Sequence, residues 1–357
     1  MKIYSCDLCF NLINFEDTEC VHCGSTLGYL PVLDNMSSIE TEDDIHWLAL
    51  APQAKGGYYR KCQNYNEKNI CNWMIPESST DELCLSCNLN EDNPDLGVKG
   101  NELYWHSLEV AKRRLVYSLL RLGLPLISKK IDSAYGLSFS FLADELPVKG
   151  KETKKVMTGH NKGKITMNIA EADDAKREKL RLEMNERYRT LLGHFRHEIG
   201  HYYWYLIVET NKELLEKFRL VFGDERANYS DSLKKHYEKS DSNDWQKEYV
   251  SQYASSHPWE DWAESWAHYM HMFDALEMAR SWGLTVNVKE GLVRPTVKLE
   301  KRVLHFEEMR DQWLYLSSAL NSLNRSMGMK DVYPFVWSEA VIEKISFVQQ
   351  VIINNHD

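Results

Sequence analysis

Hydrophobic residues recur every three to four positions through residues 188–206, which is the spacing of a helix with one buried face. They are Tyr188, Leu191, Leu192, Phe195, Ile199, Tyr202, Tyr203 and Leu206. The segment 178–189 that leads into this pattern is rich in charge. The sequence therefore predicts one long helix, with 178–189 as its exposed first half and the apolar second half packed on a core.

Similar patterns predict several further helices and a small sheet. Helical periodicity covers 103–122, 213–222, 232–237, 299–325 and 338–353, and another helix begins after Pro258. Alternating apolar and polar residues predict strands at 137–142 and 164–170. The expected architecture is α+β, mostly helical with a small sheet.

The helix that contains Phe195 also carries the motif His-Glu-x-x-His at positions 197–201. Residues four apart lie on one helix face, so His197 and His201 can present two imidazoles to a single Zn²⁺. Glu198 lies beside them, where it can act as the base that activates a water molecule. The alternative is that both histidines are ordinary residues of a helix surface.

A third zinc ligand is expected from the helix that begins after Pro258. Catalytic zinc sites keep three protein ligands and leave one position for water or substrate. Glu260 and Glu264 share a helix face, so one can bind the metal while the other orients a ligand histidine. Glu260 is the leading candidate for the ligand, and Asp261 and Glu264 are the alternatives, because the sequence does not fix the rotation of this helix.

Together the two stretches resemble the gluzincin metallopeptidases, in which His-Glu-x-x-His is followed by Glu-x-x-x-Asp/Glu. The local pattern is similar to the anthrax lethal factor type, which has a tyrosine seven residues before the second motif, here Tyr253. This resemblance implies that Glu260 is the zinc ligand and that Glu264 holds a ligand histidine. It also implies that Tyr253 donates a hydrogen bond to the oxyanion, and His257 is the alternative donor.

The whole chain resembles a bacterial family of zinc-binding metallopeptidases with an N-terminal zinc ribbon. The stretches 257–264 and 323–328 carry this likeness. It implies a zinc-dependent peptide-bond hydrolase with a zincin-like core and an unknown protein or peptide substrate. It further implies that the strand at 164–170 is an edge strand that pairs with an extended substrate. The alternative is an ordinary sheet edge protected by Lys162 and Lys164.

All eight cysteines fall within the first 87 residues and form two groups of four. The first group has the spacing of a zinc ribbon and consists of Cys6, Cys9, Cys20 and Cys23. The second group is less regular and consists of Cys62, Cys71, Cys84 and Cys87. Two structural Cys₄ zinc ions are predicted, which together with the catalytic ion makes three. Unpaired buried cysteines are the alternative for the second group.

The cysteine groups suggest a division of the chain into three parts. Residues 1–34 are predicted to form the zinc ribbon, 35–95 a linker followed by the second Cys₄ module, and 96–357 the zincin-like metallopeptidase domain. The linker is placed at 35–44, because this stretch is polar and acidic.

The net charge of −10 is concentrated in the first 100 residues, which contain six Lys and Arg and sixteen Asp and Glu. Such a surface repels phosphate backbones, so nucleic acid is not an expected partner. The acidic N-terminal module could instead dock a protein partner.

The sequence shows no export signal and no apolar run long enough to cross a bilayer, so a cytoplasmic protein without membrane contact is expected. An alternative function is a protein-interaction adaptor, in which the zinc ribbons bind and the zincin-like core is structural or dormant.

Overall fold

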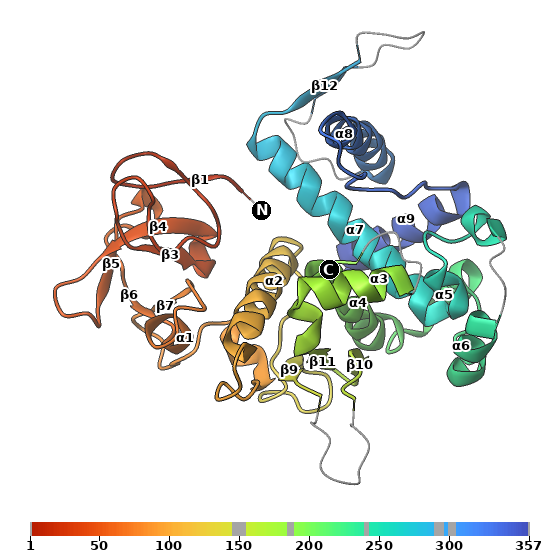
Figure 1. Ribbon diagram of the computed structural model, residues 1–357, viewed down its shortest axis with the longest axis horizontal. Coiled ribbons are helices and arrows are strands. Elements are labelled where there is room, and N and C mark those ends of the chain that lie inside the picture. The colour runs from red at the N-terminus through yellow and green to blue at the C-terminus, as the bar shows by residue number, and fades with distance from the viewer. Residues whose placement is uncertain are drawn as a thin grey trace.

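Figure 1 shows the computed structural model, in which a β-rich N-terminal module lies beside a larger, mainly helical part. The structure describes residues 2–144, 155–183, 189–238, 243–288, 296–298 and 305–355. Helices and strands in this combination confirm the predicted α+β class.

The N-terminal module is built from two small antiparallel sheets. The strands β1 (Tyr4–Ser5) and β2 (Leu12–Ile13) form the first. The second has the order β3-β4-β5-β6-β7, with every neighbouring pair antiparallel. Its strands are β3 (Leu27–Leu30), β4 (Asn35–Glu40), β5 (Trp47–Ala49), β6 (Tyr58–Lys61) and β7 (Met74–Pro76), and the short helix α1 (Gln63–Asn66) lies between β6 and β7.

The predicted linker at 35–44 is wrong for residues 35–40, which form β4. This strand pairs with β3 on one side and β5 on the other, and Met36, Ser37, Ser38 and Ile39 are all buried. The two serines lie in the interior because their hydroxyls have partners: Ser37 Oγ accepts from Ala51 N, and Ser38 Oγ accepts from Asp7 N. One sheet therefore connects the segments that carry the two cysteine groups.

The larger part contains a four-stranded sheet with the order β10-β11-β9-β8. Its strands are β8 (Asn90–Asp92), β9 (Ser138–Leu142), β10 (Gly159–Asn161) and β11 (Lys164–Asn168). The strands β8, β9 and β11 are parallel, and β10 is antiparallel to β11. The predicted strands at 137–142 and 164–170 are thus present, apart from their end residues.

The expectation that 164–170 is the edge strand is wrong. Lys162 and Gly163 both have positive φ values, 45° and 84°, which turn the chain back tightly so that β10 covers the outer side of β11. Among the residues that the structure describes, the edge on this side of the sheet is therefore β10.

The helices agree with the predicted positions, with one correction. They are α2 (Asn101–Arg121), α3 (Asp174–Glu183), α4 (Leu191–Tyr203), α5 (Lys212–Phe222), α6 (Tyr229–Glu238), α7 (Pro258–Ser281), α8 (Phe306–Ser326) and α9 (Glu339–Asn354). A hairpin of β12 (Thr285–Asn287) and β13 (Thr296–Lys298) follows α7. The start of the helix predicted at 299–325 falls partly on 299–304, outside the described residues.

The correction concerns the start of the helix that carries His197. The segment 178–189 is not its first half, because α3 is a separate helix and α4 begins only after Thr190. Thr190 has extended backbone angles, and its Oγ1 accepts a hydrogen bond from Gly193 N at 3.0 Å. This is an N-cap, which ends the preceding segment and starts a new helix.

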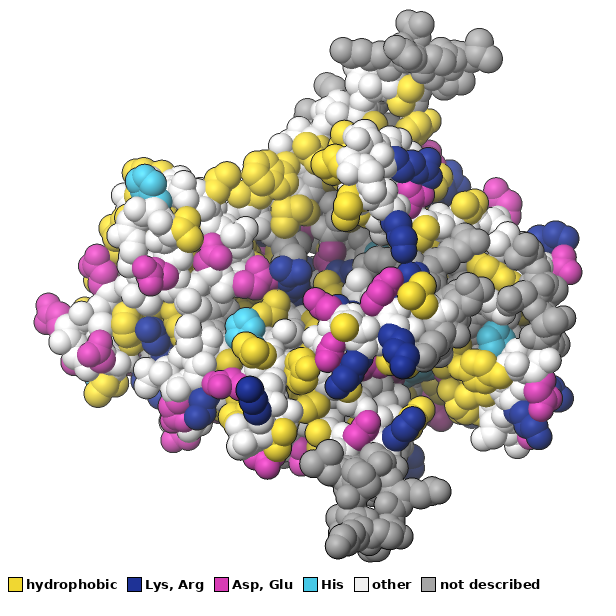
Figure 2. Space-filling model, in the orientation of Figure 1, with side chains coloured by type: hydrophobic (Ala, Val, Ile, Leu, Met, Phe, Trp, Pro, Cys, Tyr) yellow, Lys and Arg dark blue, Asp and Glu magenta, His cyan; other side chains and the backbone are white. Residues whose placement is uncertain are grey.

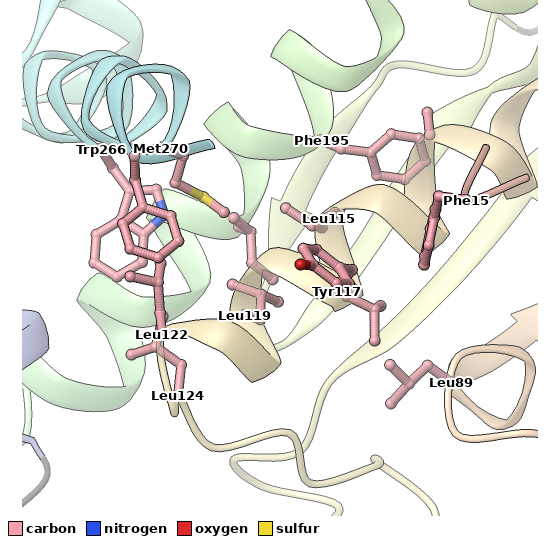
Figure 3. Close-up of a cluster of buried hydrophobic side chains, with 14 of the residues drawn as sticks. Phe15, Leu89, Leu115, Tyr117, Leu119, Leu122, Leu124, Phe195, Trp266 and Met270 are labelled. Carbon is pink, nitrogen blue, oxygen red and sulfur yellow. The ribbon is translucent and has the colours of Figure 1, made fainter. Parts of the chain in front are cut away.

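Helix α2 packs against the N-terminal module and against the other helices of the larger part (Figure 3). Tyr117 packs against Phe15 of the N-terminal module, with ring centroids 5.2 Å apart, and Leu89 is buried nearby. Towards the larger part, Phe195 of α4 and Trp266 of α7 are fully buried in the same cluster. The two parts therefore have a continuous hydrophobic core.

Candidate metal centre

Helices α4 and α7 pack closely and bring their polar side chains together. A Cβ atom at Gly200 would lie 3.0 Å from Cβ of Trp266 and 3.1 Å from Cα of Ala263, so a side chain at this position would push the two helices apart. Trp262 Nε1 donates a hydrogen bond to the carbonyl oxygen of Gly200, at 2.8 Å. The short separation is what allows carboxylates of α7 to reach histidines of α4.

The first turn of α7 is fixed by His257 and Pro258. His257 is the N-cap, and its Nδ1 accepts a hydrogen bond from Trp259 N at 3.1 Å, while Pro258 occupies the first helical position. The other ring nitrogen, Nε2, lies 3.1 Å from the carbonyl oxygen of Ala227. This assigns His257 a capping role and not the alternative role of oxyanion donor.

Three side chains converge on one point between the helices. The distances are 3.2 Å between Nε2 of His197 and Nε2 of His201, 2.9 Å from His197 Nε2 to Glu260 Oε2, and 3.5 Å from His201 Nε2 to the same oxygen. A tetrahedral zinc with bonds of about 2.0–2.1 Å places its ligands about 3.3 Å apart. The three donors therefore have the spacing of one face of a tetrahedral site, and the residues fit a zinc ion.

Glu264 contacts the opposite nitrogen of the same histidine. Its Oε1 lies 2.8 Å from Nδ1 of His197, so it can accept the ring N–H and leave Nε2 free to bind a metal. Burial disfavours the charge of Glu264, but the hydrogen bond with His197 outweighs burial and lowers the pKa of this carboxyl. Asp261 points elsewhere and forms an ion pair with Lys344 of α9, at 2.7 Å.

Glu198 is buried beside the three donors, with 8% of its surface exposed. Burial raises the pKa of its carboxyl, and the nearby carboxylates of Glu260 and Glu171 act in the same direction, against His197 and His201. A carboxylate with a raised pKa is a better proton acceptor than an exposed one.

Two tyrosines border the site, and only one of them was predicted from the sequence. The ring of Tyr253 lies 5.8 Å from that of His197. The hydroxyl of Tyr229, at the start of α6, donates a hydrogen bond to Oε1 of Glu260, with 2.7 Å between the two oxygens. Tyr229 lies 31 residues before Glu260 in the chain, and no motif or spacing in the sequence identifies it.

The cysteines form the two predicted clusters. In the first, Sγ atoms of Cys6 and Cys23 are 3.6 Å apart, as are those of Cys9 and Cys20. A tetrahedral zinc with Zn–S bonds of about 2.3 Å separates its sulfurs by about 3.8 Å, whereas a disulfide bond is about 2.05 Å long. These distances fit a metal site and not disulfides.

The second cluster consists of Cys62, Cys71, Cys84 and Cys87, and all four residues are buried. Sγ of Cys71 lies 3.7 Å from Sγ of Cys84 and 3.7 Å from Sγ of Cys87. The irregular sequence spacing therefore produces the same tetrahedral separation as the regular ribbon spacing of the first cluster.

The family comparison agrees with this arrangement. A family model described as "Putative zinc-binding metallo-peptidase" matches residues 101–351, and a model described as "zinc-ribbon domain" matches residues 3–98. The chain belongs to this metallopeptidase family. Both cysteine clusters lie within the ribbon match, and His197, His201 and Glu260 lie within the metallopeptidase match. This family member is therefore a zinc-binding protein with an N-terminal zinc-ribbon region, as predicted.

Relatives of this metallopeptidase-family chain occur in mycobacteria. Uncharacterized proteins of Mycobacterium bovis and of two Mycobacterium tuberculosis strains, CDC 1551 and H37Rv, are each 39% identical to it over 352 residues. The alignments cover 99% of this chain and 95% of each relative. No solved structure matches the chain.

The metallopeptidase helix α2 also contacts the second cysteine cluster. Arg113 is almost fully buried, and its guanidinium donates to the carbonyl oxygen of Ile70, next to Cys71 in the chain. Burial opposes the positive charge of Arg113, but the charge of Cys71, followed by those of Glu109, Cys87 and Cys84, holds the pKa of Arg113 above the usual value. The cluster is therefore electrostatically coupled to the metallopeptidase part.

The surface of the zinc-ribbon region is acidic, as its composition predicts. Figure 2 shows Asp and Glu side chains spread over this module. Docking of a protein partner there, and the lack of nucleic-acid binding, stay predictions. Among the helices that the structure describes, none has the length and apolar character needed to span a membrane.

Proposed function

We propose that this chain is a gluzincin-type zinc-dependent hydrolase of peptide bonds, acting on a protein or peptide substrate. The observation that carries the proposal is the convergence of His197, His201 and Glu260 at tetrahedral distances, with buried Glu198 alongside. Three protein ligands leave one coordination position for the reaction, which is the arrangement of catalytic zinc sites and not of structural ones.

Zinc held by these three ligands would polarise the scissile carbonyl and lower the pKa of a water molecule. Glu198 accepts a proton from the attacking water molecule while the water oxygen forms a bond with the carbonyl carbon. Glu198 then transfers this proton to the amide nitrogen, so that the C–N bond breaks and a free amine leaves. The raised pKa of Glu198 suits a group that must both accept and return a proton.

Tyr253 is the proposed donor to the oxyanion that develops on the carbonyl oxygen. Burial, followed by the charge of Glu260, raises the pKa of its hydroxyl, so the group stays protonated and can donate. A hydrogen bond that strengthens as charge develops lowers the barrier of the chemical step.

Strand β10 is the proposed binding edge for an extended substrate. Among the described residues it pairs on one side only, with β11. His160 of β10 lies beside the site, with its ring centroid 6.4 Å from that of His201. A substrate strand added along this edge would pass over the zinc ligands, with main-chain hydrogen bonds to β10.

The test is a comparison of protein N-termini in cells that contain the wild-type chain or the Glu198→Gln variant. New N-termini are expected with wild type and are expected to be absent with Glu198→Gln. Glu216→Gln, on the exposed face of α5, is a matched control and should give the wild-type set.

If both chains were folded and zinc-loaded but gave identical N-termini, and neither cleaved a peptide library, the hydrolase proposal would be contradicted. The adaptor function, with a dormant core, would then be the better explanation.

A further inference from the structure

The two oxygens of Glu260 have different partners. Oε2 faces His197 and His201, at 2.9 and 3.5 Å, and is the oxygen on the metal side. Oε1 accepts a hydrogen bond from the hydroxyl of Tyr229, with 2.7 Å between the two oxygens. Glu260 is 2% exposed, so water has little access to Oε1 and the tyrosine is its main hydrogen-bond donor.

Tyr229 also packs against α7, the helix that carries Glu260. Its ring packs edge-on against His257, with centroids 5.2 Å apart, and lies 6.1 Å from Trp259. Nε2 of His257 is hydrogen-bonded to the carbonyl oxygen of Ala227, two residues before Tyr229. The N-cap of α7 thus connects the start of α6 to the turn that carries Glu260.

Tyr229 also lies next to Tyr253, the proposed oxyanion donor. The two side chains interact through their hydroxyls, and both are close enough to Glu260 to sense its charge. One residue therefore contacts both a proposed zinc ligand and a proposed catalytic donor.

We propose that Tyr229 is a positioning residue that keeps Glu260 bound to zinc through Oε2 alone. The inference rests on the proposed function, because it assumes a zinc ion at His197, His201 and Glu260. With Oε1 engaged by the hydroxyl, the carboxylate cannot rotate to bind through both oxygens. The fourth coordination position then stays available for water and the scissile carbonyl.

The experiment uses the full-length chain with Tyr229→Phe, which keeps the ring that packs on His257 and removes only the hydroxyl. Affinity for the third zinc is measured by chelator competition, after a mild chelator has reduced the metal content to the two Cys₄ ions. Loss of a hydrogen bond to a metal ligand typically weakens metal binding about 10–100-fold, and a loss in this range is expected.

The second readout reports ligand geometry and needs no activity. Co²⁺ is added to the emptied site, and its visible absorption spectrum is compared between variants. A second carboxylate oxygen raises the coordination number, so Tyr229→Phe is expected to give weaker absorption bands than wild type. The same variant should lower kcat more than it raises KM, because an occupied fourth position impairs the chemical step.

Tyr203→Phe is the matched control. Tyr203 is fully buried on α4 and donates to the carbonyl oxygen of Pro125 at 3.0 Å, away from Glu260. This variant also loses one buried tyrosine hydrogen bond, yet it should keep wild-type zinc affinity and the wild-type cobalt spectrum.

The possible failures are distinguishable. A wild-type chain that binds only two zinc ions would contradict the proposed function, and the inference with it. A wild-type chain with three ions, together with a Tyr229→Phe variant of unchanged affinity and spectrum, would overturn the inference alone. If Tyr229→Phe and Tyr203→Phe weakened zinc binding equally, the effect would be general destabilisation, and the positioning role would also be rejected.

Discussion

Trp262 Nε1 donates a hydrogen bond to the carbonyl oxygen of Gly200, at 2.8 Å, where α7 crosses α4. This contact lies one residue from His201 and two from Glu260, so it fixes the separation of the proposed zinc ligands. The absence of a side chain at residue 200 favours this close approach, because a Cβ atom there would lie 3.0 Å from Cβ of Trp266.

Gly200→Ala should therefore weaken both the fold and the metal site. Alanine favours a helix over glycine by about 1 kcal/mol, but the new Cβ would press against Trp266 and the backbone of Ala263, and overpacking costs about 1–3 kcal/mol. We expect a small net loss of stability in urea unfolding, together with lower affinity for the third zinc. Unchanged zinc affinity would show that the helix separation is not critical.

Three carboxylates of the site should differ in their effect on catalytic zinc. Glu198→Gln should abolish hydrolysis and retain the metal, because Glu198 is not among the converging donors. Glu264→Ala should weaken zinc binding about 10–100-fold, since it removes the partner of His197 Nδ1. Glu260→Ala should lose the metal.

Elemental analysis of these variants, after dialysis against a weak chelator, gives the order directly. Near three zinc ions per chain are expected for wild type and Glu198→Gln, and near two for Glu260→Ala. An empty site in Glu264→Ala with a filled site in Glu260→Ala would reverse the roles assigned to these two residues.

Arg113→Met should destabilise the second cysteine cluster. Removing one partner of a buried charge interaction costs about 3–5 kcal/mol, and Arg113 is 2% exposed beside Ile70 and the thiols. We expect loss of one zinc ion and a lower urea midpoint. Arg114→Met is the control: Arg114 is partly exposed and pairs with Glu16 at the surface, so its loss should cost less than about 1 kcal/mol.

His268 should make the protein less stable in mild acid. Its ring is buried against Tyr333 and Phe335, and burial lowers its pKa to about 4, against a smaller opposing effect of Glu264. The unfolded chain binds a proton at higher pH than the folded one does. The contribution of His268 to the free energy of unfolding is therefore fully present above about pH 6.5 and is lost as the pH decreases towards 4.

For this one group the loss between pH 7 and pH 5 is about 2 kcal/mol. His268→Asn keeps a polar atom near Tyr333 but cannot titrate, so its stability should fall less over the same range. Urea unfolding of both chains at pH 7 and pH 5 measures this difference. If wild type and His268→Asn lost the same stability between pH 7 and pH 5, His268 would not be the source of the pH dependence. His271, whose ring is 5.7 Å from that of His268, is present in both chains, and burial lowers its pKa in the same direction.

Local sequence patterns determined the elements and the donor chemistry of this protein. The i, i+4 spacing of His197 and His201 places both on one face of any helix, whatever surrounds it. The knuckle spacing of Cys6 and Cys9 likewise acts over a few residues. Helical periodicity predicted α2 and α5 close to their observed bounds, because it reflects which face each helix buries.

Tertiary structure decided what depends on contacts between distant segments. The polar stretch 35–40 is a buried strand because β3 and β5 pair with its two sides, and β10 is the edge because the chain turns back at Lys162 and Gly163. The rotation of α7, which directs Glu260 to the histidines and Asp261 to Lys344, follows from its packing at Gly200. Tyr229 reaches Glu260 across 31 residues of sequence, and no local pattern encodes a hydrogen bond between groups that only the folded core brings together.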